Sequence, residues 1–288
     1  MHPISMIPNP VTSYLTDNAF GPIISTRPVG GGCISNGNIL NTQSGATFFL
    51  KSNPNTPNDM FTREAEGLDA LRVDGGPTIP LVYLCGYDFI LLEDLTPASP
   101  NDDYWPMFGH QLANLHNYTN PKFGFEHDNY IGSTQQSNSW IDDGYTFFAQ
   151  NRLIFQAQMA QKRGLIGKSE IHDVESIINR LEQLIPHQPA SLIHGDLWSG
   201  NAITDSAGAP AIIDPAAHYG WAEADLAMTA LFGTFPTAFY KAYEEIRPLN
   251  SNYFERFPIY NLYHLLNHLN IFGRGYLGQV QSILRRFS

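Results

Sequence analysis

The sequence predicts an α+β protein of two lobes, a β-rich N-terminal lobe followed by a mainly helical C-terminal lobe. Short apolar, β-prone runs fill the first third of the chain, whereas later apolar residues recur every three or four positions, as on a buried helix face. Between these regions, Thr96–Pro106 ("TPASPNDDYWP") is rich in proline, serine and aspartate, a composition typical of a connection. We therefore expect an N-terminal lobe over 1–95 and a C-terminal lobe over 96–288.

The N-terminal lobe is expected to contain strands, one helix and then two more strands. Residues 21–53 hold strand-like runs on either side of a glycine cluster. Met60–Val73 has apolar residues at helical spacing and acidic residues near its start, which predicts a helix. Leu81–Leu95 is apolar and β-prone and predicts two strands, because Gly86-Tyr87-Asp88 interrupts it.

The C-terminal lobe is expected to be built from amphipathic helices with aromatic faces. Five segments show apolar residues at helical spacing: 105–118, 144–164, 170–185, 235–246 and 256–272. Such stripes are more often core packing than a ligand site, so they predict the architecture rather than the function.

Composition excludes several classes of function. The 288 residues include 16 basic and 27 acidic side chains, a net charge of -11, and no Lys/Arg cluster that would serve extended nucleic-acid binding. No apolar run approaches the roughly 20 residues that span a bilayer, and "MHPISMIPNP" lacks the features of a secretory signal. Two cysteines, Cys33 and Cys85, argue against a disulfide framework. We expect a cytoplasmic, monomeric protein with no nucleic-acid or membrane partner.

Residues 191–220 ("SLIHGDLWSGNAITDSAGAPAIIDPAAHYG") carry the clearest chemical signal. Asp196 follows an apolar run, and two short β-prone runs joined by a turn should place Asn201 and Asp214 at the ends of a hairpin. The three side chains can then converge. Two carboxylates and an amide form an oxygen ligand set that suits Mg²⁺, which shares its coordination with substrate phosphates. Zinc is not expected, because no His/Cys cluster has the required spacing.

Phosphoryl transfer needs further parts, and the N-terminal lobe offers a candidate for each. The glycine-rich run Val29–Ser35 can cover phosphates with its backbone N–H groups. Lys51, on a strand, can hold the phosphates and pair with Glu64 on the following helix, while Asp196 receives the proton of the acceptor hydroxyl. Each feature alone is more often a turn, a surface lysine or a solvated glutamate. Their order along the chain is what makes the combination informative.

At this point the sequence resembles a known family. "HGDLWSGN" (194–201) with "IIDPA" (212–216) is similar to the catalytic segment of small-molecule kinases related to aminoglycoside and choline kinases. "MFTREAEGL" (60–68), "FGFEHDNYIGSTQQSNSW" (123–140), "AHYGWAEADLAMTALFG" (217–233) and "YNLYHLLNHLNIFGRGY" (260–276) narrow the resemblance to the fructosamine kinase, or ketosamine-3-kinase, family. The resemblance covers 29–276, nearly the whole chain, and implies a protein-kinase-like fold.

The resemblance implies ATP-dependent phosphorylation of the 3-hydroxyl of ketosamines, which leads to deglycation. By motif position it implies Asp196 as the catalytic base and Asn201 and Asp214 as magnesium ligands. The residues implied in ATP binding are Gly30, Gly31, Gly32, Cys33, Ile34, Ser35, Lys51, Glu64 and, through the backbone near the adenine, Glu93, Asp94 and Leu95. The candidates for the substrate are Trp198, as a wall against the sugar, and Asp128, Asn129 and Asn138, for which a structural loop role is equally compatible.

Two nearby residues are expected to be structural, and the acceptor stays open. His194 is read as a buried, hydrogen-bonded histidine, and Asp225 as a tie for the backbone of the catalytic loop. Fructosamine, ribulosamine and erythrulosamine adducts are all compatible acceptors, on protein, free amino acid or small amine. The alternatives are a kinase of the same fold acting on an aminoglycoside, choline or an amino sugar, and a non-catalytic kinase-like protein.

Overall fold

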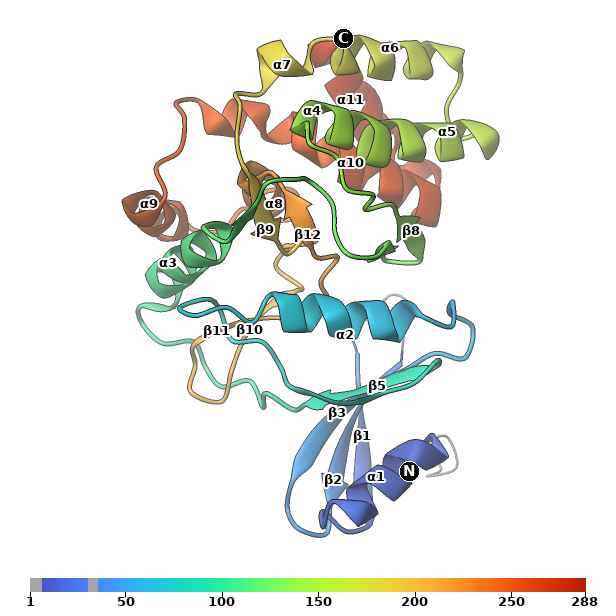
Figure 1. The fold of residues 1–288 in the computed structure, drawn as a ribbon, viewed down its shortest axis with the longest axis vertical. Helices are drawn as coiled ribbons and strands as arrows, with labels where there is room; N and C mark the ends of the chain where they lie inside the picture. The colour runs from blue at the N-terminus through green and yellow to red at the C-terminus, as the bar shows by residue number, and fades with distance from the viewer. Residues whose placement is uncertain (1–6, 31–35) are drawn as a thin grey trace.

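The computed structural model describes residues 7–30 and 36–288, and its N-terminal part is a five-stranded antiparallel sheet (Figure 1). The strands lie in the order β1-β2-β3-β5-β4. Their bounds are β1 Ile23–Val29, β2 Asn36–Thr42, β3 Thr47–Ser52, β4 Val82–Cys85 and β5 Phe89–Glu93. The predicted break at Gly86-Tyr87-Asp88 is confirmed, since the Gly86 N–H donates to the Phe89 carbonyl across the turn. The predicted α+β class is confirmed.

Two helices cover the two faces of this sheet (Figure 1). The predicted helix is α2, Met60–Ala70, which lies between the sheet and the C-terminal part of the molecule. Helix α1, Asn9–Asp17, was not predicted; Val11 and Leu15 bury it against the opposite face, in a separate apolar cluster with β2, β3 and β5. One further apolar core joins both lobes, because α2 packs its buried side toward the C-terminal lobe.

The C-terminal lobe is mainly helical, as predicted. The five predicted segments correspond to α3 Tyr104–His116, α4 Gly144–Phe148 continuing through the π-helical η2 Ala149–Ile154 into α5 Phe155–Lys162, α6 Lys168–Ile178 with α7 Leu181–Leu184, α9 Thr237–Ile246, and α10 Tyr253–Phe272. Helices α8 Ala222–Met228 and α11 Leu277–Phe287, and the 3₁₀ turn η3 Arg274–Tyr276, were not predicted. None of the helices in the described residues is long and apolar enough to cross a membrane.

Short strands between these helices carry the functional segment. A three-stranded sheet has the order β12-β9-β6, with β6 Thr119–Asn120, β9 Ala190–Ile193 and β12 His218–Gly220. Two hairpins are formed by β7 Asn129–Ile131 with β8 Thr134–Gln136, and by β10 Ala202–Thr204 with β11 Pro210–Ile212.

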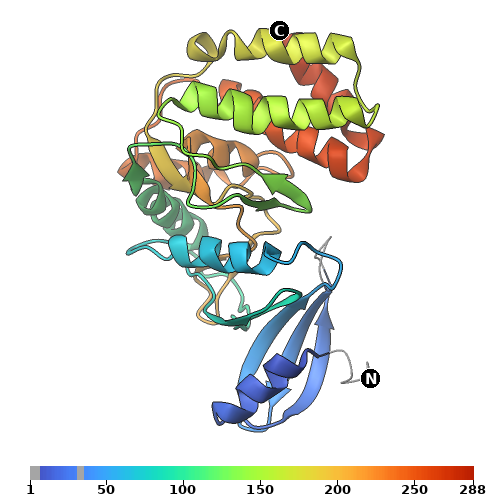
Figure 2. The ribbon, with the colours of Figure 1, turned by 45° about the vertical axis from the view of Figure 1, so that its right-hand side comes forward.

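The β10–β11 hairpin also touches the N-terminal lobe. Thr78 forms a parallel bridge with Ala211, so the segment after α2 runs alongside β11. In the second view, α2 again lies between the two lobes, directly facing the strands and loops of the C-terminal part (Figure 2). The cleft between the lobes is thus lined on one side by β3 and α2 and on the other by the loops that follow β9 and β11.

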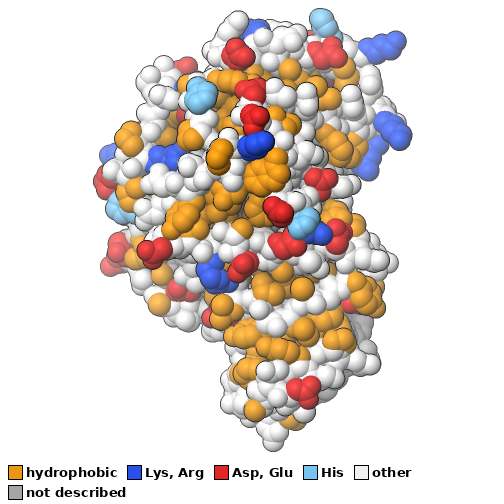
Figure 3. Space-filling model, in the orientation of Figure 1, with side chains coloured by type: hydrophobic (Ala, Val, Ile, Leu, Met, Phe, Trp, Pro, Cys, Tyr) orange, Lys and Arg blue, Asp and Glu red, His pale blue; other side chains and the backbone are white. Residues whose placement is uncertain are grey.

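Charged side chains are sparse on the surface. On the face shown in Figure 3, Lys and Arg side chains are scattered among Asp and Glu rather than gathered into one area, a distribution that accords with the net charge of -11.

Candidate active site

The β10–β11 hairpin brings Asn201 and Asp214 together, as predicted. Ala202 pairs with Ile212, and the Ile213 N–H donates to the Asn201 carbonyl at 3.1 Å, so the two residues flank the same open end. Asp214 adopts φ of 56°, in the left-handed region that costs a non-glycine residue about 1–2 kcal/mol. That conformation ends β11 and accompanies a carboxylate that reaches across to the N-terminal lobe.

Among the described residues, Lys51 is one of two cations that line the cleft, with Arg63 of α2, and it has two carboxylate partners. Its Nζ lies 2.9 Å from Oε1 of Glu64 on α2, which is the predicted pair, and 2.7 Å from Oδ1 of Asp214, which was not predicted. Burial alone lowers the pKa of Lys51, but the charges of Asp214 and Glu64 outweigh it and raise the pKa above its usual value. The ammonium group is therefore charged at neutral pH and held between the two lobes.

Asp196 lies on the loop after β9, within reach of the same cavity. Asn201 Nδ2 donates to the Asp196 backbone carbonyl at 2.8 Å and more weakly to its Oδ2 at 3.3 Å. Burial, together with the charge of Asp214, raises the pKa of Asp196 to about 7, against the hydrogen bond from Asn201. A carboxyl group with a pKa near neutrality is suited to accept a proton from a hydroxyl.

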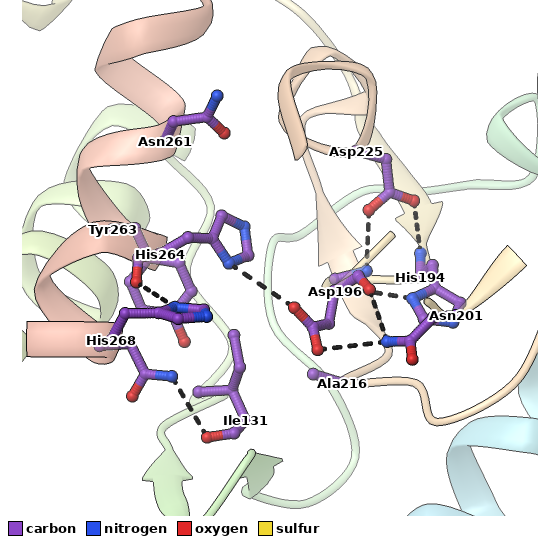
Figure 4. A network of polar contacts seen from close by, with 12 residues as sticks. Ile131, His194, Asp196, Asn201, Ala216, Asp225, Asn261, Tyr263, His264 and His268 are labelled. Carbon is purple, nitrogen blue, oxygen red and sulfur yellow. Dashed lines mark hydrogen bonds and ion pairs between the residues drawn. The ribbon is translucent and has the colours of Figure 1, made fainter. Parts of the chain in front are cut away.

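The backbone of this loop is fixed by Asp225 on α8 (Figure 4). The N–H groups of His194 and Gly195 donate to the Asp225 carboxylate at 2.6 Å and 2.8 Å, and His116 Nε2 lies 3.2 Å from it. The expectation that Asp225 ties the loop is confirmed. Gly195 has φ of 81°, and a Cβ there would lie 2.2 Å from the Ala216 carbonyl oxygen, so only glycine fits.

His194 has the structural role expected of it. Its side chain is fully buried, Nδ1 accepts from the Asp196 N–H at 3.2 Å, and Nε2 lies 2.9 Å from the Ile213 carbonyl. Because a carbonyl can only accept, the proton is on Nε2 and the ring is neutral, in agreement with a pKa lowered by burial.

A cavity of about 180 Å³ joins these groups. Its lining includes the predicted residues Lys51, Glu64, Asp196, Trp198, Asn201 and Asp214. A second wall comes from α10, through Asn267, His268, Ile271 and Phe272, and a third from Tyr130 and Ile131 of β7. Sequence reasoning missed the α10 wall; the available signal was the set of Asn and His residues that interrupt its otherwise apolar stripe.

The side chains of Asp128, Asn129 and Asn138 form hydrogen bonds with one another's segment and with the backbone of Ala217. Asp128 accepts from the Asn138 N–H at 2.7 Å, Asn129 Nδ2 donates to the Ala217 carbonyl at 2.8 Å, and Asn138 Nδ2 donates to Asn129 Oδ1 at 2.9 Å. Asn129 and Asn138 are buried, and only Asn129 lines the cavity. These hydrogen bonds accord with the structural role expected as one alternative for the three residues, and the position of Asn129 in the cavity lining keeps it a candidate acceptor contact.

The structure describes four of the remaining predicted nucleotide contacts: Gly30, Glu93, Asp94 and Leu95. Gly30 directly follows β1 and is exposed, whereas Gly31, Gly32, Cys33, Ile34 and Ser35 lie outside the described residues. Glu93 ends β5, Asp94 Oδ1 accepts from the Thr96 N–H at 3.0 Å, and Leu95 is buried; none of these three lines the cavity.

The donor set fits a magnesium ion better than a softer metal. The amide nitrogen of Asn201 is bonded to Asp196, which leaves its amide oxygen as the available ligand beside the Asp214 carboxylate. Within residues 7–30 and 36–288, no group of three or more His, Cys, Asp or Glu side chains could hold a metal alone. Such a two-residue oxygen site is typical of Mg²⁺ that completes its shell with water and nucleotide phosphates.

This fold and this site define a kinase-like phosphotransferase with a small sheet lobe joined to a larger helical lobe. The family model described as "Fructosamine kinase" matches residues 10–288, so the chain belongs to the fructosamine kinase family, whose members are ATP-dependent phosphotransferases acting on a hydroxyl group.

Individual relatives agree with this assignment. A Synechocystis protein named as a probable ketoamine kinase is 40% identical over 267 residues, covering 90% of this chain and 89% of the relative. The chloroplastic protein-ribulosamine 3-kinase of Oryza sativa subsp. indica is 36% identical, over 94% of this chain and 80% of the relative. A crystal structure from Thermobifida fusca YX-ER1, described as a "putative fructosamine-3-kinase", superposes with a TM-score of 0.88 at 31% identity, covering 97% of this chain and 98% of that one.

Proposed function

We propose that the chain transfers the γ-phosphoryl group of ATP, with Mg²⁺, to the 3-hydroxyl of a ketosamine, either a fructosamine, ribulosamine or erythrulosamine adduct. The observation that carries the proposal is the single cavity in which Lys51, Asp214 and Asp196 meet, in a member of the fructosamine kinase family. Phosphorylation at this position destabilises the sugar adduct, so the biological outcome is deglycation, as the family implies.

The residues divide the reaction between them. Lys51, oriented by Glu64, binds the phosphates of ATP, and the glycine-rich run 29–35, of which 31–35 lie outside the described residues, is the proposed cover for them. Asn201 and Asp214 would hold Mg²⁺, which supplies electrostatic stabilisation of the charge on the transferring phosphoryl group. Asp196 accepts the proton of the acceptor hydroxyl as its oxygen attacks the γ-phosphorus; the bond to the bridging oxygen breaks and ADP leaves.

The acceptor is proposed to lie between Trp198 and α10. Trp198 lines the cavity half-buried, and its ring packs edge-on against Phe232 with ring centroids 6.1 Å apart and an interplanar angle of 81°. A rigid apolar ring face of this kind suits the C–H face of a sugar. His268 faces the same cavity from α10, and its Nδ1 lies 2.8 Å from the His264 carbonyl, which leaves Nε2 as a hydrogen-bond acceptor.

An acceptor panel tests the proposal. Fructosyllysine, ribulosyllysine, erythrulosyllysine, choline and an aminoglycoside are each incubated with the chain, Mg²⁺ and ATP, and the phosphate position is read by NMR. We expect a 3-phosphate on at least one ketosamine and no product from choline or the aminoglycoside. Exclusive phosphorylation of choline or the aminoglycoside, or no transfer to any acceptor, contradicts the proposal.

We also propose that the protein is a monomer and is located in the cytoplasm. Gel filtration checks the oligomeric state, and cell fractionation checks the location.

A further inference from the structure

Helix α10 places a row of polar side chains in the interior of the C-terminal lobe, and three buried atoms of the helix lack a hydrogen-bond partner among the described residues: Asn261 Oδ1, His264 Nδ1 and Asn270 Oδ1. Asn261, His264 and Asn267 follow one another at three-residue spacing and therefore share a face of the helix. Asn261 Nδ2 donates to the Ala227 carbonyl at 2.8 Å, and Asn267 Oδ1 accepts from Gln156 at 3.2 Å. His264 Nδ1 is buried and has no hydrogen-bond partner among the described residues. An imidazole nitrogen left in this state is costly unless it is used.

The unpartnered nitrogen faces the catalytic carboxylate (Figure 4). His264 Nδ1 lies 4.0 Å from Oδ1 of Asp196, whereas Asn201 holds the other carboxylate oxygen at 3.3 Å. This separation is about 1 Å longer than a hydrogen bond. The Asp196 side chain keeps 22% of its surface exposed, so it is not fixed by packing on all sides.

The acceptor does not reach His264. The side chain is 4% exposed and is absent from the lining of the 180 Å³ cavity. It lines instead a smaller cavity of about 20 Å³ behind the catalytic loop, together with Gly195, Asp225 and Arg152. A space of this size holds one water molecule and gives the ring room to shift. The His264 side chain therefore does not contact an acceptor in the larger cavity, and Asp196 is the proposed reacting group that its ring faces, at 4.0 Å.

We propose, on the basis of the function proposed above, that His264 is a positioning residue: its Nδ1–H donates to Asp196 Oδ1 and, with Asn201 on Oδ2, aims the carboxylate at the acceptor hydroxyl. The ring acts as a neutral donor, because burial lowers the pKa of His264 to about 3; His268 and Arg152 act in the same direction and Asp225 opposes them. A neutral imidazole carries a single N–H, and a facing carboxylate favours the tautomer that has it on Nδ1. Proton acceptance itself stays with Asp196.

Isosteric substitutions separate this role from a merely structural one. His264→Leu replaces the imidazole with an apolar side chain of similar size and so removes the hydrogen-bond donor. In His264→Asn, the amide nitrogen occupies nearly the position of Nδ1 and can still donate. We expect kcat of the Leu variant to fall about 10-fold, the loss typical of a hydrogen bond to a charged group, with KM for ATP unchanged. The Asn variant should recover most of kcat. His110→Leu is the matched control, because it also removes an imidazole, from a histidine on α3 whose side chain is 40% exposed and does not line the cavity.

A double variant isolates the path through Asp196. In an Asp196→Asn background, His264→Leu should have no further effect on kcat, because the carboxylate it positions is gone. A Leu variant with wild-type kcat, an Asn variant as impaired as Leu, or full additivity with Asp196→Asn overturns the inference. If the Leu variant fails to fold, His264→Gln replaces it. The Gln amide lies near the position of Nε2 rather than Nδ1, so kcat of this variant should fall by the amount expected for Leu. Wild-type kcat in Asp196→Asn alone would overturn the base role proposed for Asp196, whereas failure of the acceptor panel would overturn the proposed function, so these failures are distinguishable from failure of the inference about His264.

Discussion

At the scale of single residues, Asp214 has two tasks that meet at one carboxylate. It lies 2.7 Å from Lys51, and its other proposed task is to hold Mg²⁺ with Asn201. The contact crosses the cleft from β11 to β3, so it also links the two lobes. Because the Asp214 carboxylate contacts Lys51 and is also the proposed Mg²⁺ ligand, its removal should weaken nucleotide binding more than the removal of a neighbouring side chain.

Asp214→Ala should abolish the Mg²⁺-dependent stabilisation by ATP against thermal unfolding. Ligand binding stabilises the folded state by mass action, and loss of the metal ligand removes the differential affinity. The measurement is Tm with and without ATP, each at 0 and saturating Mg²⁺. Asp142→Ala removes an exposed carboxylate that pairs with Lys122 and should keep the full shift. If the Asp214 variant keeps the wild-type shift, the metal assignment is wrong.

The sequence allowed part of this residue-scale picture to be predicted. The Lys51–Glu64 pair could be expected because both residues lie in adjacent elements, 13 positions apart. The Lys51–Asp214 contact joins residues 163 positions apart and depends on how the lobes close, which no local pattern encodes. The same reason explains why His264 and His268 were missed: only the packing of α10 beside the catalytic loop brings them to the site.

At the scale of elements, the catalytic loop is held from behind by α8 and β12. Asp225 accepts from two consecutive backbone N–H groups, and Gly195 passes within contact distance of the Ala216 backbone. The strands and helices with long periodic patterns were predictable. The short strands β6, β9 and β12 were not, because they are two to four residues long and pair across large sequence separations. The π-helical turn between α4 and α5 also carries no periodic signal.

Gly195→Ala should destabilise the fold and abolish activity. The new Cβ would lie 2.2 Å from the Ala216 carbonyl oxygen, in addition to the cost of φ at 81°. Gly164→Ala is a matched control, because its φ of 68° carries the same conformational cost while no atom lies within 4 Å of the added Cβ. Urea unfolding should show a loss of about 1 kcal/mol for Gly164→Ala and at least twice that for Gly195→Ala. If both variants lose the same free energy of unfolding, the close approach of Gly195 to the Ala216 carbonyl does not contribute to stability as we expect.

At the scale of the whole molecule, the larger of the two apolar clusters in the described residues runs through both lobes, and several histidines are buried in the C-terminal lobe. Burial lowers the pKa of His116, His194, His218 and His264 below the usual value. Each ring protonates more readily in the unfolded chain than in the folded one. Their contribution to stability is therefore present at pH above about 6.5 and decreases as the pH falls below it.

The free energy of unfolding should decrease between pH 7.5 and pH 5.5. Each such histidine contributes a slope of up to about 1.4 kcal/mol per pH unit. Asp196 and Glu64, whose pKa values are raised by burial, bind protons more readily in the folded state and offset part of this loss. Four histidines outnumber these two carboxyl groups, so the net direction holds. Urea unfolding at the two pH values measures it, and an unchanged or higher free energy of unfolding at pH 5.5 would show that the histidines are not held neutral by the fold.

The central claim is that Asp196 takes the acceptor proton in a cavity where Lys51, Asn201 and Asp214 hold Mg²⁺ and ATP. Its most direct test is the turnover of Asp196→Asn with a ketosamine that the wild type phosphorylates, together with the Kd for ATP in the presence of Mg²⁺. We predict that kcat falls by roughly 100-fold or more, the usual contribution of a general base, while Kd for ATP stays close to that of the wild type. An Asp196→Asn variant that phosphorylates the ketosamine at the wild-type rate would contradict the account.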